Sequence, residues 1–351
     1  MDSRERVLAA FERRGYDRIP VKHEGTPEVN RQLMDYFGVN GHDALLERLG
    51  DDFRYVQANW SGPDLRTFPD GSWEGLWGER YADLSFGDGV YPEAVYLPFE
   101  HVTRVAELAG YRFPTPDDFD YTTVRTQCEQ RAGYAVVFGS AGSFDFINGI
   151  ARCRGVERVL VDIATEDPVY LALMDQRHQF FMGMFERALE AAGGRIDFVH
   201  IGEDLGTQNG PLISPRQFER LFAPKFGAVF ALAHRYGART MMHSCGSVRR
   251  LIPRLIDLGL DVLDVVQVGA AGMGLHELWD AYGDQLCFCG TMDVQTVLPF
   301  GDVADVRREV ETRLELFSEG GLFLGPTHAV QVGTPLQNTL EMYRAAGSLR
   351  G

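Results

Sequence analysis

From Tyr134 to its last residues the chain alternates short apolar runs with segments of helical pattern. In chain order the apolar runs are YAVVFGS, DFVHIGED, RTMMHSCG, VLDVVQV, LCFCGTM and GLFLGP. A strand followed by a helix, repeated, is the pattern of parallel βαβ units. The earlier runs IPVKHEG (19–25) and FRYVQAN (53–59) bring the predicted strands to about eight, which favours a closed (β/α)8 TIM barrel over an open doubly wound sheet. No GxGxxG follows the first strand, so a dinucleotide-binding domain is disfavoured.

Two segments lie outside this repeat. Ser3 is expected to cap a first helix that runs to about Arg14. Residues 51–133 are rich in Trp, Tyr, Phe, Gly and Pro and contain hairpin-like runs. We expect 55–130 to be an irregular excursion that covers one end of the barrel, either as a lid over a substrate or as an insertion that only packs. No linker interrupts the chain, so 1–351 is predicted to be one domain.

The composition of the chain excludes some classes of binding partner. Lys and Arg number 34 against 50 Asp and Glu, and the net charge of −16 argues against a nucleic acid or an anionic membrane. No run approaches the ~18 apolar residues of a membrane span, and the N-terminal segment lacks a signal-peptide core. Five cysteines without a disulfide-scaffold spacing indicate a reducing compartment. We therefore expect a cytoplasmic protein that acts on a small molecule, with no oligomeric state favoured.

The strongest candidate site is His243-Ser244-Cys245, at the end of the run RTMMHSCG. Side chains of a strand alternate between its faces, so Met241, His243 and Cys245 point the same way. If that way is the barrel axis, an imidazole and a thiolate lie side by side as two zinc ligands. His328, at the end of the last run, is the expected third ligand. The alternatives are an inert buried pair and, for the third ligand, Cys289.

Other polar residues also end predicted strands, where the chemistry of such barrels is located. One of Glu203 and Asp204 must face inward, and there it could fill a metal position, act as a general base or hold a ligand histidine. We expect Glu203 to face inward, and Asp204 either to share the catalytic role or to cap a helix. The expected substrate-binding residues, each with an ordinary structural alternative, are His23, Gln267, Asp293 and Gln295.

Several longer runs carry a family resemblance. In chain order they are SRERVLAAFERRGYDRIPV, GEDLGTQNGPLISPRQFERLFAPKF, HSCGSV, GTMDVQTVLPFG and GPTHAVQVGTPLQNTLEMY. The chain resembles the uroporphyrinogen decarboxylase superfamily over nearly its whole length, most weakly across 55–130. The resemblance implies a (β/α)8 barrel, in agreement with the strand count.

The superfamily has two branches. The true decarboxylases bind their acidic substrate through an arginine-rich segment of the form RQAGRY, whereas the equivalent stretch here is VKHEGTPEVNRQL. Their catalytic aspartate is also not evident in FRYVQANW. The corrinoid-dependent methyltransferases carry a His-x-Cys zinc pair, matched here by His243 and Cys245, and a late third ligand that is often cysteine. This chain has His328 at that point, which fits either branch.

The resemblance to the second branch implies a zinc-dependent methyltransferase. It would transfer a methyl group between a small methylated donor or a thiol and a corrinoid (cobalamin). Because no Asp-x-His-x-x-Gly run is present, the corrinoid would come from a separate protein or be free cobalamin. The alternatives are decarboxylation of uroporphyrinogen or another acidic substrate, a zinc-dependent lyase reaction on a small metabolite, and a non-catalytic ligand-binding barrel.

Overall fold

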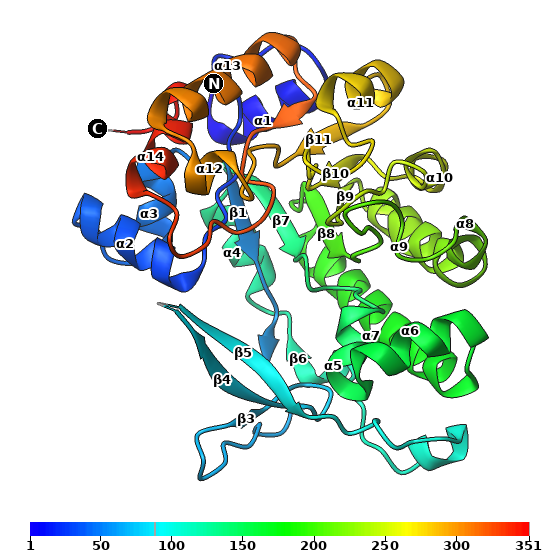
Figure 1. Ribbon diagram of the computed structural model, residues 1–351. Helices are drawn as coiled ribbons and strands as arrows, with labels where there is room; N and C mark the ends of the chain where they lie inside the picture. Colours follow the sequence, from blue (N-terminus) through cyan, green and yellow to red (C-terminus); the bar gives the residue numbers. More distant parts are fainter. Residues whose placement is uncertain (88, 351) are drawn as a thin grey trace.

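A parallel sheet forms the centre of the protein in the computed structural model, which describes residues 1–87 and 89–350 (Figure 1). It has seven strands, adjacent in the order β1, β7, β8, β9, β10, β11, β12. Their bounds are β1 Phe53–Val56, β7 Ala135–Gly139, β8 Phe198–Gly202, β9 Arg239–His243, β10 Val262–Asp264, β11 Cys287–Cys289 and β12 Leu322–Phe323.

The predicted first strand closes this sheet into a barrel. Lys22 N donates to Leu324 O, 2.8 Å away, just beyond β12, and Asp52 N donates to Val21 O, 3.0 Å away, just before β1. Val21 and Leu324 also form a parallel bridge. The segment around Val21 therefore fills the gap between the two edge strands, and the predicted (β/α)8 barrel is confirmed.

Helices follow the strands and surround the barrel (Figure 1). Before β1 lie α1 (Ser3–Phe11), α2 (Pro27–Phe37) and α3 (His42–Leu49); between β6 and β9 lie α4 (Val124–Gln130), α5 (Asn148–Arg154), α6 (Val156–Thr165), α7 (Pro168–Ala192), α8 (Pro215–Gln217) and α9 (Ala223–Arg235). The remaining helices are α10 (Ile252–Leu258), α11 (Leu275–Tyr282), α12 (Val297–Phe300), α13 (Val303–Leu316) and α14 (Leu336–Ala345). Among the described residues, no helix combines the length and the apolarity that crossing a membrane requires.

The first helix differs from the expected one at both ends. Asp2, not Ser3, is its N-cap: the Asp2 side chain accepts from Glu5 N, and Glu5 reaches back to Asp2 N in a capping box. The helix ends at Phe11 rather than near Arg14. A carboxylate caps as well as a hydroxyl does, and the spacing to Glu5 decides between the two candidates.

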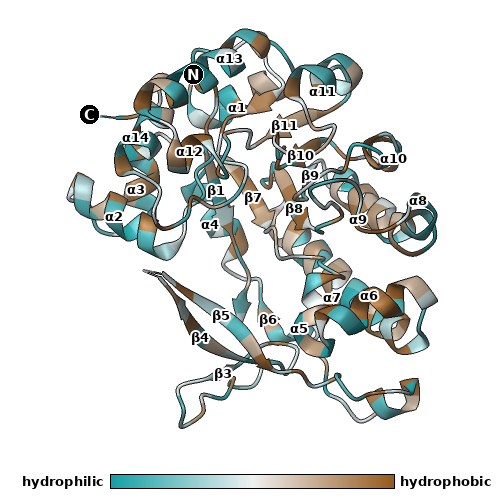
Figure 2. Ribbon diagram, in the orientation of Figure 1, coloured by the Kyte–Doolittle hydropathy of each residue, from teal (hydrophilic) through white to brown (hydrophobic). Residues whose placement is uncertain are grey.

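Two apolar clusters stabilise the barrel. The larger packs the outer faces of the strands against the helices, and the strands β7 and β8 are largely hydrophobic in Figure 2. The smaller fills the interior and contains Phe198 of β8, Met241 of β9, Val262 of β10 and Cys287 of β11, with α1 packed across the N-terminal end. Because strand side chains alternate, these residues establish which face of each strand points inward.

The expected excursion forms two small sheets. In one, β2 (Asn59–Trp60) pairs with β6 (Phe119–Asp120); in the other, β3 (Trp73–Glu74), β4 (Arg80–Phe86) and β5 (Gly89–Tyr96) are antiparallel. The short 3-10 helices Val105–Leu108 and Pro116–Asp118 lie between them. The β4–β5 hairpin lies beyond the C-terminal ends of the barrel strands (Figure 1), and Val90 N donates to Glu28 of α2 at 3.4 Å. The excursion therefore covers the barrel end at which the strands finish.

Candidate metal centre

Three side chains that are able to bind a metal converge at the C-terminal mouth of the barrel. They are His243 at the end of β9, Cys245 two residues later and Asp204 two residues after β8, and one ligand atom from each lies within 4.8 Å of the others. The Cys245 Sγ lies 3.4 Å from His243 Nε2, and an Asp204 oxygen lies 3.8 Å from the same nitrogen.

Strand alternation explains why these three meet. Met241 lies in the interior cluster, so His243, two residues on, also points inward, as the sequence predicts. Phe198 does the same for β8, which turns His200 and then Asp204 toward the axis. Gly202 and His243 are register partners, so both strand ends stop at the same level of the barrel.

Hydrogen bonds from backbone amides to side-chain oxygens hold the loops after β8 and β9 together. Cys245 N donates to Asp204 Oδ1 at 3.0 Å, and Leu205 N donates to Ser244 Oγ at 3.0 Å. A Cβ on Gly206 would stand 2.5 Å from the carbonyl oxygen of Cys245, so only glycine permits this approach. The Asp204 carboxylate and the backbone of Cys245 are therefore held in place without a metal.

A buried polar layer lies directly beneath His243. Asp264 of β10 is fully buried, and its carboxylate oxygens lie 3.4 Å from His243 Nδ1, 3.0 Å from His200 Nε2 and 3.3 Å from Lys22 Nζ. Tyr55 OH lies 3.0 Å from His200 Nδ1. Burial opposes ionisation of Asp264, but Lys22 and the two histidines outweigh it and hold the pKa of the carboxyl well below its ordinary value.

Sequence reasoning did not identify this layer, although the signal was present. His200 and Asp264 each stand two residues beyond a residue of the apolar interior cluster, namely Phe198 and Val262. The interior thus changes from apolar to polar as the strands approach their C-terminal ends. Knowing the inward face of each of these strands would have placed the side chains inside the barrel.

The donor set fits zinc. A nitrogen at ~2.0 Å and a sulfur at ~2.3 Å from one tetrahedral ion stand about 3.5 Å apart. The observed separation of His243 Nε2 and Cys245 Sγ is 3.4 Å. His243 also turns its other nitrogen toward a carboxylate, the arrangement typical of zinc-binding histidines. Asp204 offers a third donor, and the fourth side of a tetrahedral ion would stay open to solvent.

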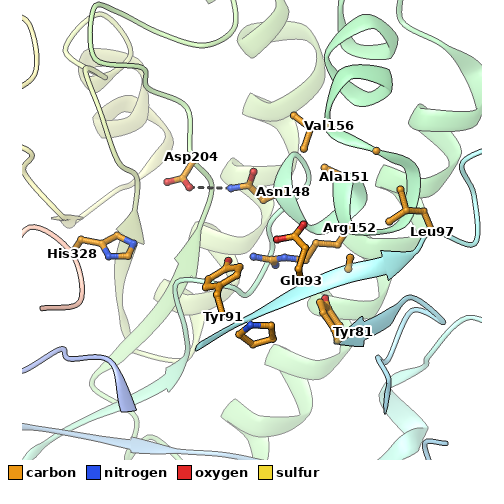
Figure 3. Close-up of a pocket in the computed structure, with 13 residues that line it drawn as sticks. Tyr81, Tyr91, Glu93, Leu97, Asn148, Ala151, Arg152, Val156, Asp204 and His328 are labelled. Carbon is orange, nitrogen blue, oxygen red and sulfur yellow. Dashed lines mark hydrogen bonds between the residues drawn. The ribbon is translucent and has the colours of Figure 1, made fainter. Parts of the chain in front are cut away.

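That open side faces a cavity of about 410 Å³ between the barrel mouth and the hairpin. Figure 3 shows Tyr91 and Glu93 of β5 and Arg152 of α5 on one side, with Asp204 and His328 on the other. Asn148 Nδ2 donates to Asp204 Oδ2 at 3.0 Å, the bond drawn in Figure 3. The excursion thus supplies one wall of the cavity in front of the candidate metal centre.

The two candidate third ligands occupy different places. His328 is exposed at the cavity edge, with its ring centroid 6.3 Å from that of His243, and its role as a ligand stays a prediction. Cys289 lies inside the barrel, where it is the register partner of Asp264. Burial raises the pKa of the Cys289 thiol well above its ordinary value. Asp204, rather than either of them, completes the compact group.

The side chain of Glu203 does not face the barrel interior, as was expected from the sequence. Its side chain is buried on the outer side of β8, where it accepts from Phe146 N at 2.7 Å and Ile147 N at 3.1 Å. Burial raises the pKa of Glu203 well above its ordinary value, and Asp145 adds to the shift. The expectation that Glu203 faces inward is wrong, because the alternation that places Phe198 inside the barrel turns Asp204, and not Glu203, inward.

Of the predicted substrate-binding residues, His23 is committed to contacts within the protein. Its Nδ1 lies 2.5 Å from Tyr343 OH of α14 and its Nε2 lies 2.8 Å from Asn30 Oδ1 of α2. Burial lowers the pKa of His23 to about 4. Its neighbours Lys22 and Glu24 instead contact each other, with Lys22 Nζ 3.4 Å from the Glu24 carboxylate.

This environment of His23 predicts that stability falls as the pH drops from about 6.5 to about 4. Between those pH values the unfolded chain binds a proton at His23 that the folded chain rejects, so protonation favours unfolding. The full difference is about 3 kcal/mol, with no further loss from this group below pH ~4. Urea unfolding at pH 7, 5.5 and 4 should show a smaller loss in His23→Gln than in the parent. The exposed-site variant His101→Gln is the control, and an equal loss in all three proteins would contradict the prediction.

The other three predicted substrate-binding residues support the loops around the site. Gln267 accepts from Gly246 N at 2.8 Å and donates to Gln295 at 3.0 Å, and so holds the turn that follows Cys245. Asp293 accepts from Gln295 N at 2.7 Å, ahead of α12. Their binding of a substrate stays a prediction.

The fold and the site together define a (β/α)8 barrel with a His-Cys-Asp group at its C-terminal mouth. The family model described as uroporphyrinogen decarboxylase (URO-D) matches residues 83–349. The chain therefore belongs to the uroporphyrinogen decarboxylase family. A search among curated proteins gives no match.

One solved structure shows the same architecture. A methyltransferase from Methanosarcina mazei has a TM-score of 0.66 at 17% identity, covering 99% of this chain and 98% of that one. A B12-independent methionine synthase from Shewanella sp. W3-18-1, in complex with selenomethionine, has a TM-score of 0.42 at 10% identity, covering 92% and 84%. At these identities the first likeness shows the fold alone, and the second adds nothing to the assignment.

Proposed function

We propose that this protein is a zinc-dependent methyltransferase that moves a methyl group between a small methylated donor or a thiol and a corrinoid. The observation that carries the proposal is the 3.4 Å approach of His243 Nε2 and Cys245 Sγ at the open mouth of the barrel. The solved methyltransferase of the same fold supports this branch of the family. The corrinoid would be brought by a separate protein or be free cobalamin.

In this proposal the chain's own residues bind the ion and orient the substrate. His243, Cys245 and Asp204 would hold zinc, and His328, on the same side of the cavity, would approach it as a further ligand. Bound zinc would supply a Lewis acid for a thiol or for the heteroatom of a methyl donor. Asn148 and the Cys245 amide hold the two oxygens of Asp204, so the carboxylate keeps its direction.

The cavity fits a small substrate rather than a macromolecule. Its volume of about 410 Å³ lies within the range of small-molecule sites. Tyr91 of the hairpin and Arg152 of α5 offer a hydroxyl and a cation at a distance from the metal ligands. All five cysteines are free thiols, which fits the proposed cytoplasmic location.

Decarboxylation of an acidic porphyrinogen is the second candidate, because it is the activity after which the family is described. The helix that follows the first strand, α2, carries a single arginine, Arg31, which is exposed. One arginine there is a poor match for a substrate with several carboxylates. A lyase reaction on a small metabolite would use the same metal centre.

The test is a parallel assay of the purified protein with both classes of substrate. We expect about one zinc per chain, methyl transfer between methylcobalamin and thiols followed by the cobalamin spectrum, and no coproporphyrinogen from uroporphyrinogen. Turnover of uroporphyrinogen by the metal-free protein would establish the decarboxylase instead. Stoichiometric zinc without methyl transfer over a broad panel of thiols and methylated donors would contradict the methyltransferase proposal and favour a lyase or a ligand-binding barrel.

A further inference from the structure

We infer that Asp264 is a positioning residue for the metal centre: it holds His243 in the tautomer and orientation that leave Nε2 free as a ligand, and Lys22 is its charge partner. The inference rests on the proposed zinc site. It assigns a role to two buried residues that do not themselves reach the metal.

The position of Asp264 relative to His243 is the first argument. The two residues are direct register partners on adjacent strands, and Oδ2 of Asp264 lies 3.4 Å from His243 Nδ1. A neutral imidazole has one N–H and one lone pair. If Nδ1 donates to Asp264, the lone pair is on Nε2, the nitrogen that faces Cys245 at 3.4 Å. Asp264 thus orients the imidazole ring of His243 whether or not a metal ion is bound.

The charge balance beneath the site is the second argument. Asp264 has no exposed surface, and a carboxylate in such a place must be paired. Lys22 Nζ lies 3.3 Å from the other oxygen, Oδ1, so the oxygen that faces His243 stays available. Lys22 is itself only 5% exposed. One oxygen therefore faces the lysine while the other faces the two histidines.

His200 extends this arrangement to the neighbouring strand. Its Nε2 lies 3.0 Å from the same Oδ2, and Tyr55 OH holds its other nitrogen at 3.0 Å. His200 Nε2 makes no hydrogen bond among the described residues, so its contact with Asp264 is an electrostatic one: a second imidazole stands beside the oxygen that faces His243.

Two double variants separate positioning from charge. Lys22→Met/Asp264→Leu removes both charges together with the acceptor for His243 Nδ1. Lys22→Met/Asp264→Asn removes the same charges but keeps an amide oxygen that can face the histidines. Replacing a buried ion pair with apolar side chains of similar volume is often tolerated, so the leucine chain is expected to fold. The asparagine chain keeps the volume of the aspartate and a polar contact for the histidines, so it is expected to fold as well. Circular dichroism and thermal melts check that they do.

Zinc affinity is the readout, measured by competition with a chromophoric chelator at pH 7. We expect Lys22→Met/Asp264→Leu to bind zinc about 10- to 100-fold more weakly than the parent, the usual effect of losing a carboxylate behind a metal-bound histidine. The Lys22→Met/Asp264→Asn chain should bind within a few-fold of the parent. If the leucine chain does not fold, the single variant Asp264→Asn replaces it. Lys22 and His243 face different oxygens of Asp264, and an amide has only one oxygen, so it cannot accept from both sides.

Each possible set of zinc affinities either supports or overturns the positioning role of Asp264. Parent-like affinity in both double variants overturns the inference but leaves the proposed zinc site intact. Equal weakening in both variants assigns the effect to charge and also overturns the positioning role. A parent protein that binds no zinc overturns the zinc site and the inference together, so the two failures are distinguishable.

Discussion

Replacing Cys245 with alanine is expected to remove zinc from the protein and to leave the fold almost unchanged. The thiol is one of the three donors in the compact group, and a zinc site that loses its sulfur ligand keeps little affinity. The side chain is only partly buried and stands in a loop, so its loss opens no core cavity. The backbone bond from residue 245 to Asp204 survives the substitution.

The measurement is zinc per chain by inductively coupled plasma mass spectrometry, with a thermal melt of the same samples. We expect about one zinc in the parent, less than about 0.1 in Cys245→Ala, and a change in unfolding free energy below about 1 kcal/mol. Cys289→Ala is the matched control. It truncates another thiol close to the barrel axis, inside the apolar cluster, and should keep its zinc. Zinc lost from the control and kept in Cys245→Ala would move the site to β11.

The adjacent carboxylates Glu203 and Asp204 are expected to respond differently to neutral substitution. Asp204→Asn replaces a donor that stands 3.8 Å from His243 Nε2, and should weaken zinc binding by about tenfold or more with little effect on stability. Glu203→Gln should keep its zinc but lose about 1–3 kcal/mol of stability, because the amide cannot accept from both Phe146 N and Ile147 N.

Glu203→Gln should nevertheless slow the reaction. The two amides that Glu203 holds lie at the start of α5, directly before Asn148, which donates to Asp204. A displaced α5 therefore changes the direction of the Asp204 carboxylate without removing a donor from the zinc, because the Cys245 amide still holds its other oxygen. Chelator competition, thermal melts and kcat measured on both variants check the prediction. An unchanged kcat in Glu203→Gln would remove that residue from the mechanism, and unchanged zinc affinity in Asp204→Asn would remove Asp204 from the site.

The barrel was predictable because its signal is local. Each βα unit appears as a short apolar run followed by a helical pattern, and six such runs follow one another after Tyr134. The first strand was the hardest to define, since in the structure it is held only by the isolated bridges of Val21 and Gly25 and a few flanking bonds. The excursion over the barrel mouth was recognised by its composition, but its hairpin and the cavity it encloses depend on contacts with α2 and α5.

The candidate site also has a part that the sequence predicts and a part that only the structure shows. His243 and Cys245 lie two residues apart, so the alternation of one strand suffices to bring an imidazole and a thiol together. The choice of Asp204 over Glu203 required the inward face of β8 to be known, and the sequence does not mark that face when both residues are carboxylates.

By itself the sequence determined the strand-helix repeat, the family and the His-Cys pair. Only the tertiary structure decided that Asp204 joins the pair, that His23 turns away to Tyr343, and that Asp264 and Lys22 meet beneath His243. The physical reason is register. Lys22 and Asp264 are 242 residues apart in sequence, and their 3.3 Å contact exists because the closed barrel sets the strands at one level, a relation that no short stretch of sequence contains.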